Sequence, residues 1–158
     1  MRTQITDLLD THGIPYRLLP HSEAVYTVEA AAAQRGVVAE EMVKSILLRE
    51  KSGERRYVMA CVLGHERLDP KAVRMVLGDE QWRRLTFALA TEISAVTGYI
   101  KGAVAPLCLP EELPVIFDVA IADCHKVNIS SGDPMSGLEL DPQALIMLAN
   151  AITADIAN

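Results

Sequence analysis

Two short apolar runs, residues 42–48 and 57–63, most strongly limit how this chain can fold. The link between them is polar and contains glycine, in the segment 51–54. Short apolar runs joined by such a link are typical of an antiparallel β-hairpin. The sequence therefore predicts a hairpin against which the other elements pack.

Helix caps and strand patterns predict the remaining elements. Thr27 and Gly36 bound an alanine-rich helix, and Asp-Pro pairs at 69–70 and 141–142 each open another. We predict helices within 5–12, 27–36, 69–78, 92–96 and 141–156, and strands at 16–19, 42–48, 57–63, 86–90, 114–122, 126–129 and 138–140. This irregular order predicts an α/β chain of the α+β type, with a mixed, largely antiparallel, barrel-like sheet surrounded by helices. Residues 1–158 are expected to form a single domain.

Composition narrows the class of protein. Half of the residues are hydrophobic and 23% are charged, which is typical of a globular chain. The net charge of -6 disfavours broad binding to a phosphate backbone such as DNA, although it leaves room for a local basic pocket. The three cysteines form no CxxC pair and the histidines are scattered, so we expect neither a metal nor a cofactor. Without a signal peptide or a membrane-spanning run, the chain is expected to be cytoplasmic and to bind no membrane.

Lys44 is an unusual residue in the first apolar run. Because side chains alternate between the faces of a strand, Lys44 shares a face with Met42, Ile46 and Leu48. One interpretation is that its stem lies along apolar surface while the ammonium reaches water, and the strand pattern alone favours it. The other is that the ammonium enters a cavity and meets an anionic or oxygen-rich ligand.

Two further segments are candidates for a binding site. Residues 98–106 contain two glycines and end in Pro106, so backbone N–H groups near Gly102 could face a carbonyl oxygen. An ordinary glycine-bounded loop would have the same composition. Residues 130–134, Ser-Ser-Gly-Asp-Pro, indicate only a turn when taken alone.

Taken together and in this order, these segments resemble the YbaK/ProX family of aminoacyl-tRNA deacylases, which is related to the editing insertion domain of bacterial prolyl-tRNA synthetases. The resemblance covers nearly the whole chain. It rests on VKSIL at 43–47, TGYIKGAVAPL at 97–107, VNISSG at 127–132 followed by GLEL at 137–140, and PHS at 20–22. It implies a compact α/β barrel-like domain that hydrolyses the ester between a wrong amino acid and the terminal ribose of a tRNA.

The resemblance also implies roles for individual residues. Lys44 would engage phosphate or ribose oxygens of the terminal adenosine, and the loop from Gly102 to Pro106 would bind the aminoacyl carbonyl. Lys44, Gly102 and Pro106 are thus the expected catalytic set. The expected substrate-binding residues are His21, Tyr99, Lys101, Ala103, Val104, Ala105, Ser131 and Gly132. The nucleophile would be water or the substrate's own side chain.

The substrate implied by the resemblance is tRNA(Pro) mischarged with cysteine or alanine. The expected partners are the tRNA acceptor end and prolyl-tRNA synthetase, with the chain a monomer or weak homodimer. One alternative is a non-catalytic module that binds a nucleotide or aminoacyl-adenylate-like ligand, or a synthetase accessory domain. Another is a simple esterase using Ser131 or Cys124, although no histidine is predictably placed beside either.

Overall fold

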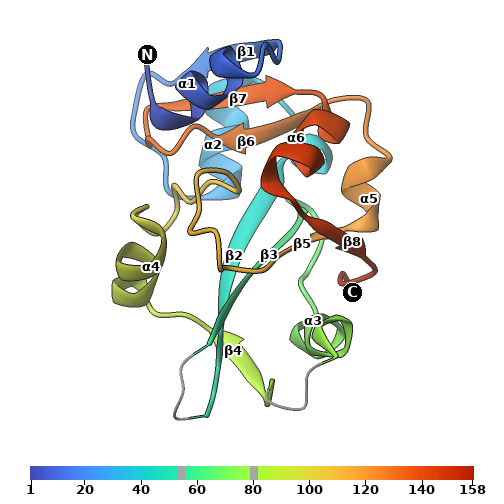
Figure 1. The fold of residues 1–158 in the computed structure, drawn as a ribbon. Coiled ribbons are helices and arrows are strands. Elements are labelled where there is room, and N and C mark those ends of the chain that lie inside the picture. Colours follow the sequence, from blue (N-terminus) through green and yellow to red (C-terminus); the bar gives the residue numbers. More distant parts are fainter. Residues whose placement is uncertain (53–55, 79–81) are drawn as a thin grey trace.

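The computed structural model describes residues 1–52, 56–78 and 82–158, and Figure 1 traces its elements along the chain. Its helices are α1 (Gln4–Thr11), α2 (Val28–Arg35), α3 (Pro70–Leu77), α4 (Ala90–Thr97), α5 (Val119–Ala122) and α6 (Pro142–Ala149), with a 3-10 turn η1 (Ala39–Glu41). Its strands are β1 (Tyr16–Pro20), β2 (Val43–Glu50), β3 (Tyr57–Leu63), β4 (Leu85–Phe87), β5 (Val115–Asp118), β6 (Val127–Ser130), β7 (Ser136–Leu140) and β8 (Ile152–Ala154).

The strands form two sheets, one in the order β4-β2-β3-β5-β8 and the other in the order β1-β7-β6. The β1/β7, β6/β7, β2/β3 and β2/β4 pairs are antiparallel, whereas β3/β5 and β5/β8 are parallel. The predicted mixed, largely antiparallel sheet with surrounding helices is thereby confirmed. The predicted hairpin is also present, with Val43 opposite Leu63, and residues 53–55 of its link lie outside the described residues.

The two sheets meet where β2 begins. Met42, just before β2, forms an isolated parallel bridge with Asn128 in the middle of β6. In Figure 1 the upper end of β2 accordingly lies close to β6, while its other end runs down to β4. This junction brings the beginning of the hairpin beside the end of β6.

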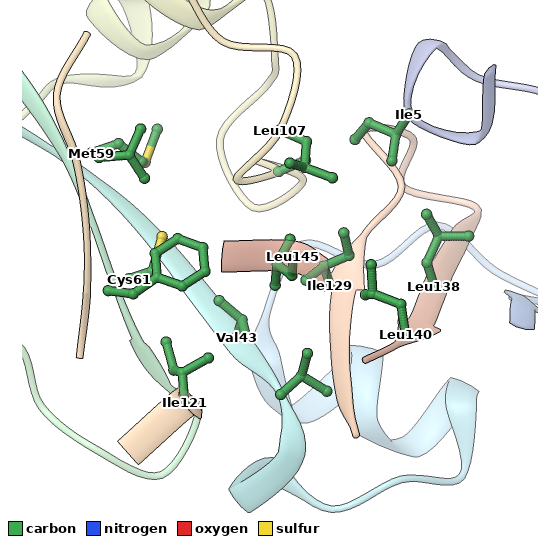
Figure 2. Close-up of a cluster of buried hydrophobic side chains, with 14 of the residues drawn as sticks. Ile5, Val43, Met59, Cys61, Leu107, Ile121, Ile129, Leu138, Leu140 and Leu145 are labelled. Carbon is green, nitrogen blue, oxygen red and sulfur yellow. The ribbon is translucent and has the colours of Figure 1, made fainter. Parts of the chain in front are cut away.

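The main core fills the space between the sheets and the helices. Figure 2 shows aliphatic side chains that enter it from both sheets, from α1, α5 and α6, and from the loop after α4. Its fully buried members include Ile5, Met59, Cys61, Phe117, Ile121, Val127, Ile129, Leu138 and Leu145. Burying one such aliphatic side chain stabilises a fold by roughly 1.5–3 kcal/mol, so this cluster holds the sheet junction in place.

Two sequence predictions are wrong in their extent. The strand predicted at 114–122 ends at Asp118, because the Asp118 carboxylate accepts a hydrogen bond from Ala120 N at 3.1 Å and caps α5. The closing helix stops at Asn150, which adopts a left-handed conformation with φ 50°. Ile152, predicted on that helix, instead pairs with Ile116 in a parallel strand. Its pairing with β5 is a long-range contact that helical periodicity cannot reveal.

The other predicted elements are confirmed with small shifts in their bounds. The strand at 86–90 is observed as β4, and the helical turn at 92–96 is the middle of α4. Helix α2 begins where Thr27 Oγ1 accepts from Ala30 N at 3.1 Å and ends at Gly36, whose φ is 68°. These caps place Arg35 at the last residue of α2.

Candidate active site

The sheet junction forms one wall of a cavity of about 200 Å³. Because Met42 pairs with Asn128 in parallel, the residues two positions further along, Lys44 and Ser130, lie on the same side of the junction. The loop before α2, the helix itself and the loop after α4 complete the enclosure. The lining residues are Tyr26, Thr27, Val28, Ala31, Arg35, Met42, Val43, Lys44, Ser45, Gly102, Val104 and Ser130.

The charge of this cavity is opposite to that of the whole chain. Its lining contains two cationic side chains, Lys44 and Arg35, and no carboxylate. The chain as a whole carries a net charge of -6. Since opposite charges attract, the cavity lining favours an anionic or oxygen-rich group on an otherwise acidic protein.

Lys44 is half-buried, and part of the hydrogen-bonding capacity of its ammonium is used within the protein. It donates a hydrogen bond to the carbonyl oxygen of Glu66 at 2.6 Å and makes a longer contact of 3.5 Å with that of Gly64. Burial lowers the pKa of Lys44, while the neighbouring carboxylates of Glu29 and Glu66 act in the opposite direction. An ammonium has three N–H donors, so at least one is left to face the cavity. Lys44 is therefore a positioned cation with limited donor capacity.

Gly102 allows the loop after α4 to approach the loop before α2. Its φ is 90°, a conformation that side chains with a Cβ rarely adopt. A Cβ at this position would lie 2.7 Å from Tyr26 Cα and closer still to the Tyr26 carbonyl oxygen. The contact brings Gly102 into the cavity wall beside Val104.

The amides of this loop differ in their availability. Ala103 N donates to the carbonyl of Ile100 at 2.9 Å, which removes it as a donor. The N–H groups of Gly102 and Val104 make no hydrogen bond within the described part of the chain. Within this loop they are thus the two amides of cavity-lining residues that could donate to a substrate carbonyl oxygen.

The remaining members of the loop support the cavity without lining it. Of these residues, Ala103, Ala105 and Pro106 are buried, and Lys101 is exposed to solvent outside the cavity. Ala103 also accepts a hydrogen bond from Ser130 Oγ at 3.2 Å. Ser130 therefore connects the end of β6 to the loop after α4.

Tyr99 lies in the core, where only 4% of its surface is exposed. Its hydroxyl donates to Leu107 O at 2.6 Å and accepts from Gln4 Nε2 at 3.3 Å. The ring passes next to Gly132, where a Cβ would lie 2.8 Å from Tyr99 Cε1. Tyr99 and Gly132 thus pack against each other behind the cavity, and neither lines it.

Ser131 is fully buried and lies outside the cavity lining. Its hydroxyl contacts the Ser136 carbonyl at 3.0 Å and the Ser136 hydroxyl at 2.7 Å, which closes the turn between β6 and β7. Cys124 is held near the carbonyls of Ala120 and Glu40, and burial raises the pKa of its thiol. Neither residue is presented as a nucleophile of the kind that an esterase needs.

His21 lies in the first loop and contacts the cavity wall through Arg35. Its Nδ1 is 2.8 Å from the carbonyl oxygen of Pro134, and Arg35 Nε donates to His21 Nε2 at 3.1 Å. These partners assign the proton to Nδ1 of a neutral ring. Burial lowers the pKa of His21, which favours that neutral state.

Arg35 is a cavity residue that the sequence interpretation missed. One sequence feature could have indicated it. Arg35 ends an alanine-rich helix, and the residues three and four positions before it, Ala32 and Ala31, cannot form an ion pair with it. Burial lowers its pKa to about 10. The expected sites that line the cavity are Lys44, Gly102 and Val104, whereas His21 reaches it through Arg35.

Other kinds of site have less support. Within residues 1–52, 56–78 and 82–158, no group of three or more His, Cys, Asp or Glu side chains is placed to hold a metal ion. The helices in these same ranges are all too short or too polar to cross a bilayer. A small, cationic cavity with free backbone amides fits the binding of a polar carbonyl compound such as an ester.

Comparison with known proteins assigns the chain to a family. The model of the aminoacyl-tRNA editing domain matches residues 22–148. This chain belongs to that family, and the class of enzyme is an aminoacyl-tRNA deacylase. The matched range contains the whole cavity lining, and the resemblance found in the sequence is confirmed.

The names of two curated relatives specify an amino acid. The chain is 24% identical over 158 residues to "Putative Cys-tRNA(Pro)/Cys-tRNA(Cys) deacylase EbsC" of Enterococcus faecalis, covering 98% of this chain and 93% of that protein. It is 29% identical over 101 residues to the proline--tRNA ligase of Bacillus licheniformis, covering 64% of this chain and 17% of the ligase. The second match therefore concerns one segment of a much longer protein.

Solved structures share the fold. The crystal structure of hypothetical protein APE2540 has a TM-score of 0.87 and 26% identity, covering 99% of this chain and 100% of the other. That of "a putative trans-editing enzyme for prolyl tRNA synthetase" has a TM-score of 0.78 and 24% identity, covering 100% and 99%. The similarity extends over the whole length, so the arrangement of both sheets is shared.

Proposed function

We propose that this chain is a trans-editing hydrolase that removes cysteine or alanine from mischarged tRNA(Pro). The observation that carries the proposal is the convergence of Lys44 with the Gly102 and Val104 amides on one small cavity without carboxylates. Ester hydrolysis needs a positioned carbonyl and donors aimed at the oxygen that becomes negative. These residues supply such donors from two separate elements.

In the proposed reaction, the ester carbonyl oxygen accepts hydrogen bonds from Gly102 N and Val104 N. The oxygen of a water molecule, or a thiol of the substrate itself, attacks the carbonyl carbon. The negative charge that develops on the carbonyl oxygen is stabilised by the two amides and by the Lys44 ammonium. The bond between the acyl carbon and the ribose oxygen then breaks, and the proton lost by the attacking water or thiol passes to that oxygen. The products are a free ribose hydroxyl and the amino acid, which is released as its cyclic thioester when the substrate thiol attacks. Removing one such donor commonly lowers the rate a hundredfold or more.

The size and chemistry of the cavity favour a small side chain. Its volume of about 200 Å³ must hold the acyl group and part of the ribose, and Ala31, Val43 and Val104 make part of the wall apolar. A pocket rejects a substrate mainly when its side chain is too large or when polar groups are left unpaired. The side chains of cysteine and alanine are small and nearly apolar, so they fit this wall. The name of the Enterococcus relative supports cysteine.

The proposal extends to partners and location. The expected ligand is the acceptor end of tRNA, because the remainder of an acidic chain has little attraction for the tRNA body. We place the enzyme in the cytoplasm as a single domain spanning 1–158, monomeric or weakly dimeric, with prolyl-tRNA synthetase as its partner. The match to a proline--tRNA ligase segment supports this partner.

A panel of mischarged tRNAs tests the proposal. Purified protein is incubated with tRNA(Pro) carrying cysteine, alanine or proline, and with tRNA(Cys) carrying cysteine, and release of the amino acid is followed over time. We expect turnover of at least one mischarged tRNA(Pro) and none of Pro-tRNA(Pro). Binding without release from any member would favour a non-catalytic module that holds the same ligand. Release of proline at the same rate would contradict an editing function.

A further inference from the structure

Arg35 carries a positive charge that no residue in the described part of the chain neutralises. No salt bridge involves its guanidinium, and none of its interactions is left unaccounted for there. Taking an unpaired cation partly out of water is unfavourable. Surface arginines such as Arg2 and Arg17 are, in contrast, paired with Asp7 and Glu139. An unpaired cation in a cavity wall indicates that an anion binds there from outside the chain.

The structure makes space for this guanidinium. A Cβ at Gly137 of β7 would overlap Arg35 Nε and Cζ, so only glycine lets the guanidinium lie against the strand backbone. Gly137 has no positive φ, and it pairs normally with Leu19 and with Ser130. Its backbone conformation would therefore accept a larger residue, and the nearby arginine is the reason for glycine here.

His21 fixes the orientation of the guanidinium. Arg35 Nε donates to His21 Nε2, and the ring is itself held through Nδ1 to Pro134 O. The two terminal nitrogens of Arg35 form no hydrogen bond with the described residues. Arg35 is thus anchored through Nε and presents its two-nitrogen fork to a ligand, an arrangement that suits the paired oxygens of a phosphate.

Arg35 and Lys44 lie toward different ends of helix α2. Glu29, in the first turn, is near enough to raise the pKa of Lys44, whereas Arg35 is the last helical residue. Six residues of helix correspond to roughly 9 Å along its axis. A ligand with its ester near Lys44 and the Gly102 loop could therefore extend along α2 toward Arg35.

We propose that Arg35, held by His21 and accommodated by Gly137, binds a phosphate of the terminal nucleotide while the ester carbonyl occupies the Lys44 and Gly102 end of the cavity. This assignment rests on the proposed function, since it takes the substrate to be an aminoacylated nucleotide. It moves the phosphate-binding role from Lys44, whose ammonium is already partly bonded to carbonyls, to Arg35. Lys44 then acts on the ester and ribose oxygens.

Phosphate is favoured over a carboxylate by the substrate itself. The carboxyl group of an aminoacyl ester is esterified and neutral, and the side chains of cysteine and alanine carry no anion at neutral pH. The 5′-phosphate is attached to the same ribose as the ester, so it is the anionic group of the substrate that accompanies the ester into the site. An acidic aminoacyl side chain is the competing source of negative charge, and the test below includes it.

The experiment compares small ester substrates. The aminoacyl group that the tRNA panel selects is attached to the 2′(3′)-oxygen of adenosine or of adenosine 5′-monophosphate, and kcat/KM is measured for both. For the wild-type protein we expect the 5′-phosphate to raise kcat/KM on the order of tenfold or more, mainly through KM. In Arg35→Gln this ratio should fall to about one.

Two further variants separate charge from position. Gly137→Ala keeps the Arg35 charge but displaces the guanidinium, so the phosphate preference should fall there too. Arg17→Gln removes one cation from an exposed ion pair on neighbouring β1 and should retain the wild-type ratio. Circular dichroism checks that each variant is folded.

Each outcome bears on a different claim. Hydrolysis of both esters with equal kcat/KM by the wild-type protein would overturn the phosphate site and leave the deacylase function standing. Hydrolysis of neither ester, together with an inactive tRNA panel, would refute the function itself. Preference of the wild-type protein for an aspartyl over an alanyl ester of adenosine, lost in Arg35→Gln, would overturn phosphate in favour of a carboxylate. A preserved phosphate preference in Arg35→Gln would also overturn the assignment.

Discussion

Replacing Gly102 by alanine tests whether the loop after α4 must approach the loop before α2 for deacylation. The new Cβ would lie 2.7 Å from Tyr26 Cα. Carbon atoms in contact are normally about 3.5–4.0 Å apart, so the two loops must separate by roughly 1 Å. A displacement of that size in a catalytic group can lower the rate on the order of a hundredfold.

The substitution also has a conformational cost. An alanine held at φ 90° is strained by about 1–3 kcal/mol, which lowers the free energy of unfolding whether or not the site is disturbed. Gly98→Ala provides the matched control, because Gly98 has φ 78° but its Cβ would meet nothing within 4 Å. The control shares the backbone strain and lacks the clash with the neighbouring loop.

The assay combines thermal unfolding with single-turnover deacylation of the active mischarged tRNA. We expect both variants to unfold at lower temperature, and Gly102→Ala alone to lose about a hundredfold in deacylation rate. Gly98→Ala should remain within a few-fold of wild type. A folded Gly102→Ala protein with a rate equal to that of Gly98→Ala would refute the reasoning that this contact positions the carbonyl donors.

Three other predictions concern stability and the roles of single residues. Burial lowers the pKa of His21 below its usual 6.5; Arg35 acts in the same direction, whereas the Pro134 carbonyl and Asp133 oppose it. The neutral His21 ring therefore contributes stability that is complete above about pH 6.5 and is lost as the pH falls further. Urea unfolding should show this decline, and His21→Gln should reduce it; an identical pH dependence in both proteins would contradict the assignment. Ser131→Ala should lower the free energy of unfolding by about 1–3 kcal/mol with deacylation within a few-fold of wild type, and loss of hydrolysis in a folded protein would restore the esterase alternative. Leu145→Ala should destabilise by about 2–5 kcal/mol because its side chain is fully buried, whereas Met147→Ala on the exposed face of α6 should change stability by less than about 0.5 kcal/mol, and equal effects would refute this core assignment.

Local signals in the sequence predicted most of the elements correctly. Thr27 and Gly36 define α2, and Asp69 with Pro70 opens α3, because caps act through contacts within a few residues. The error in the closing helix occurred where a long-range contact decides the conformation. Ile152 continues an apolar helical pattern but pairs with β5, and its partner Ile116 is far away in the sequence.

The candidate site was predictable only in part for the same reason. Gly102 and Lys44 could be recognised by residue type and by resemblance. The sequence did not show, however, that the Lys44 ammonium donates a hydrogen bond to the carbonyl of Glu66, which lies beyond the end of β3. Arg35 gave almost no signal, since its placement depends on a hydrogen bond to His21 and on the space that Gly137 leaves. Arg35, His21 and Gly137 are far apart in the sequence and come together only when α2 packs against β7.

The most direct test of the central claim is the single-turnover deacylation rate of Cys-tRNA(Pro) and Ala-tRNA(Pro) with Lys44→Ala. Lys126→Ala, which removes an exposed lysine near Glu139, serves as the control for net charge. If Lys44 stabilises the charge that develops on the ester, its loss should reduce the rate about a hundredfold or more while circular dichroism and thermal unfolding stay close to wild type. Equal rates for wild type, Lys44→Ala and Lys126→Ala would contradict the claim that this cavity is the deacylase site.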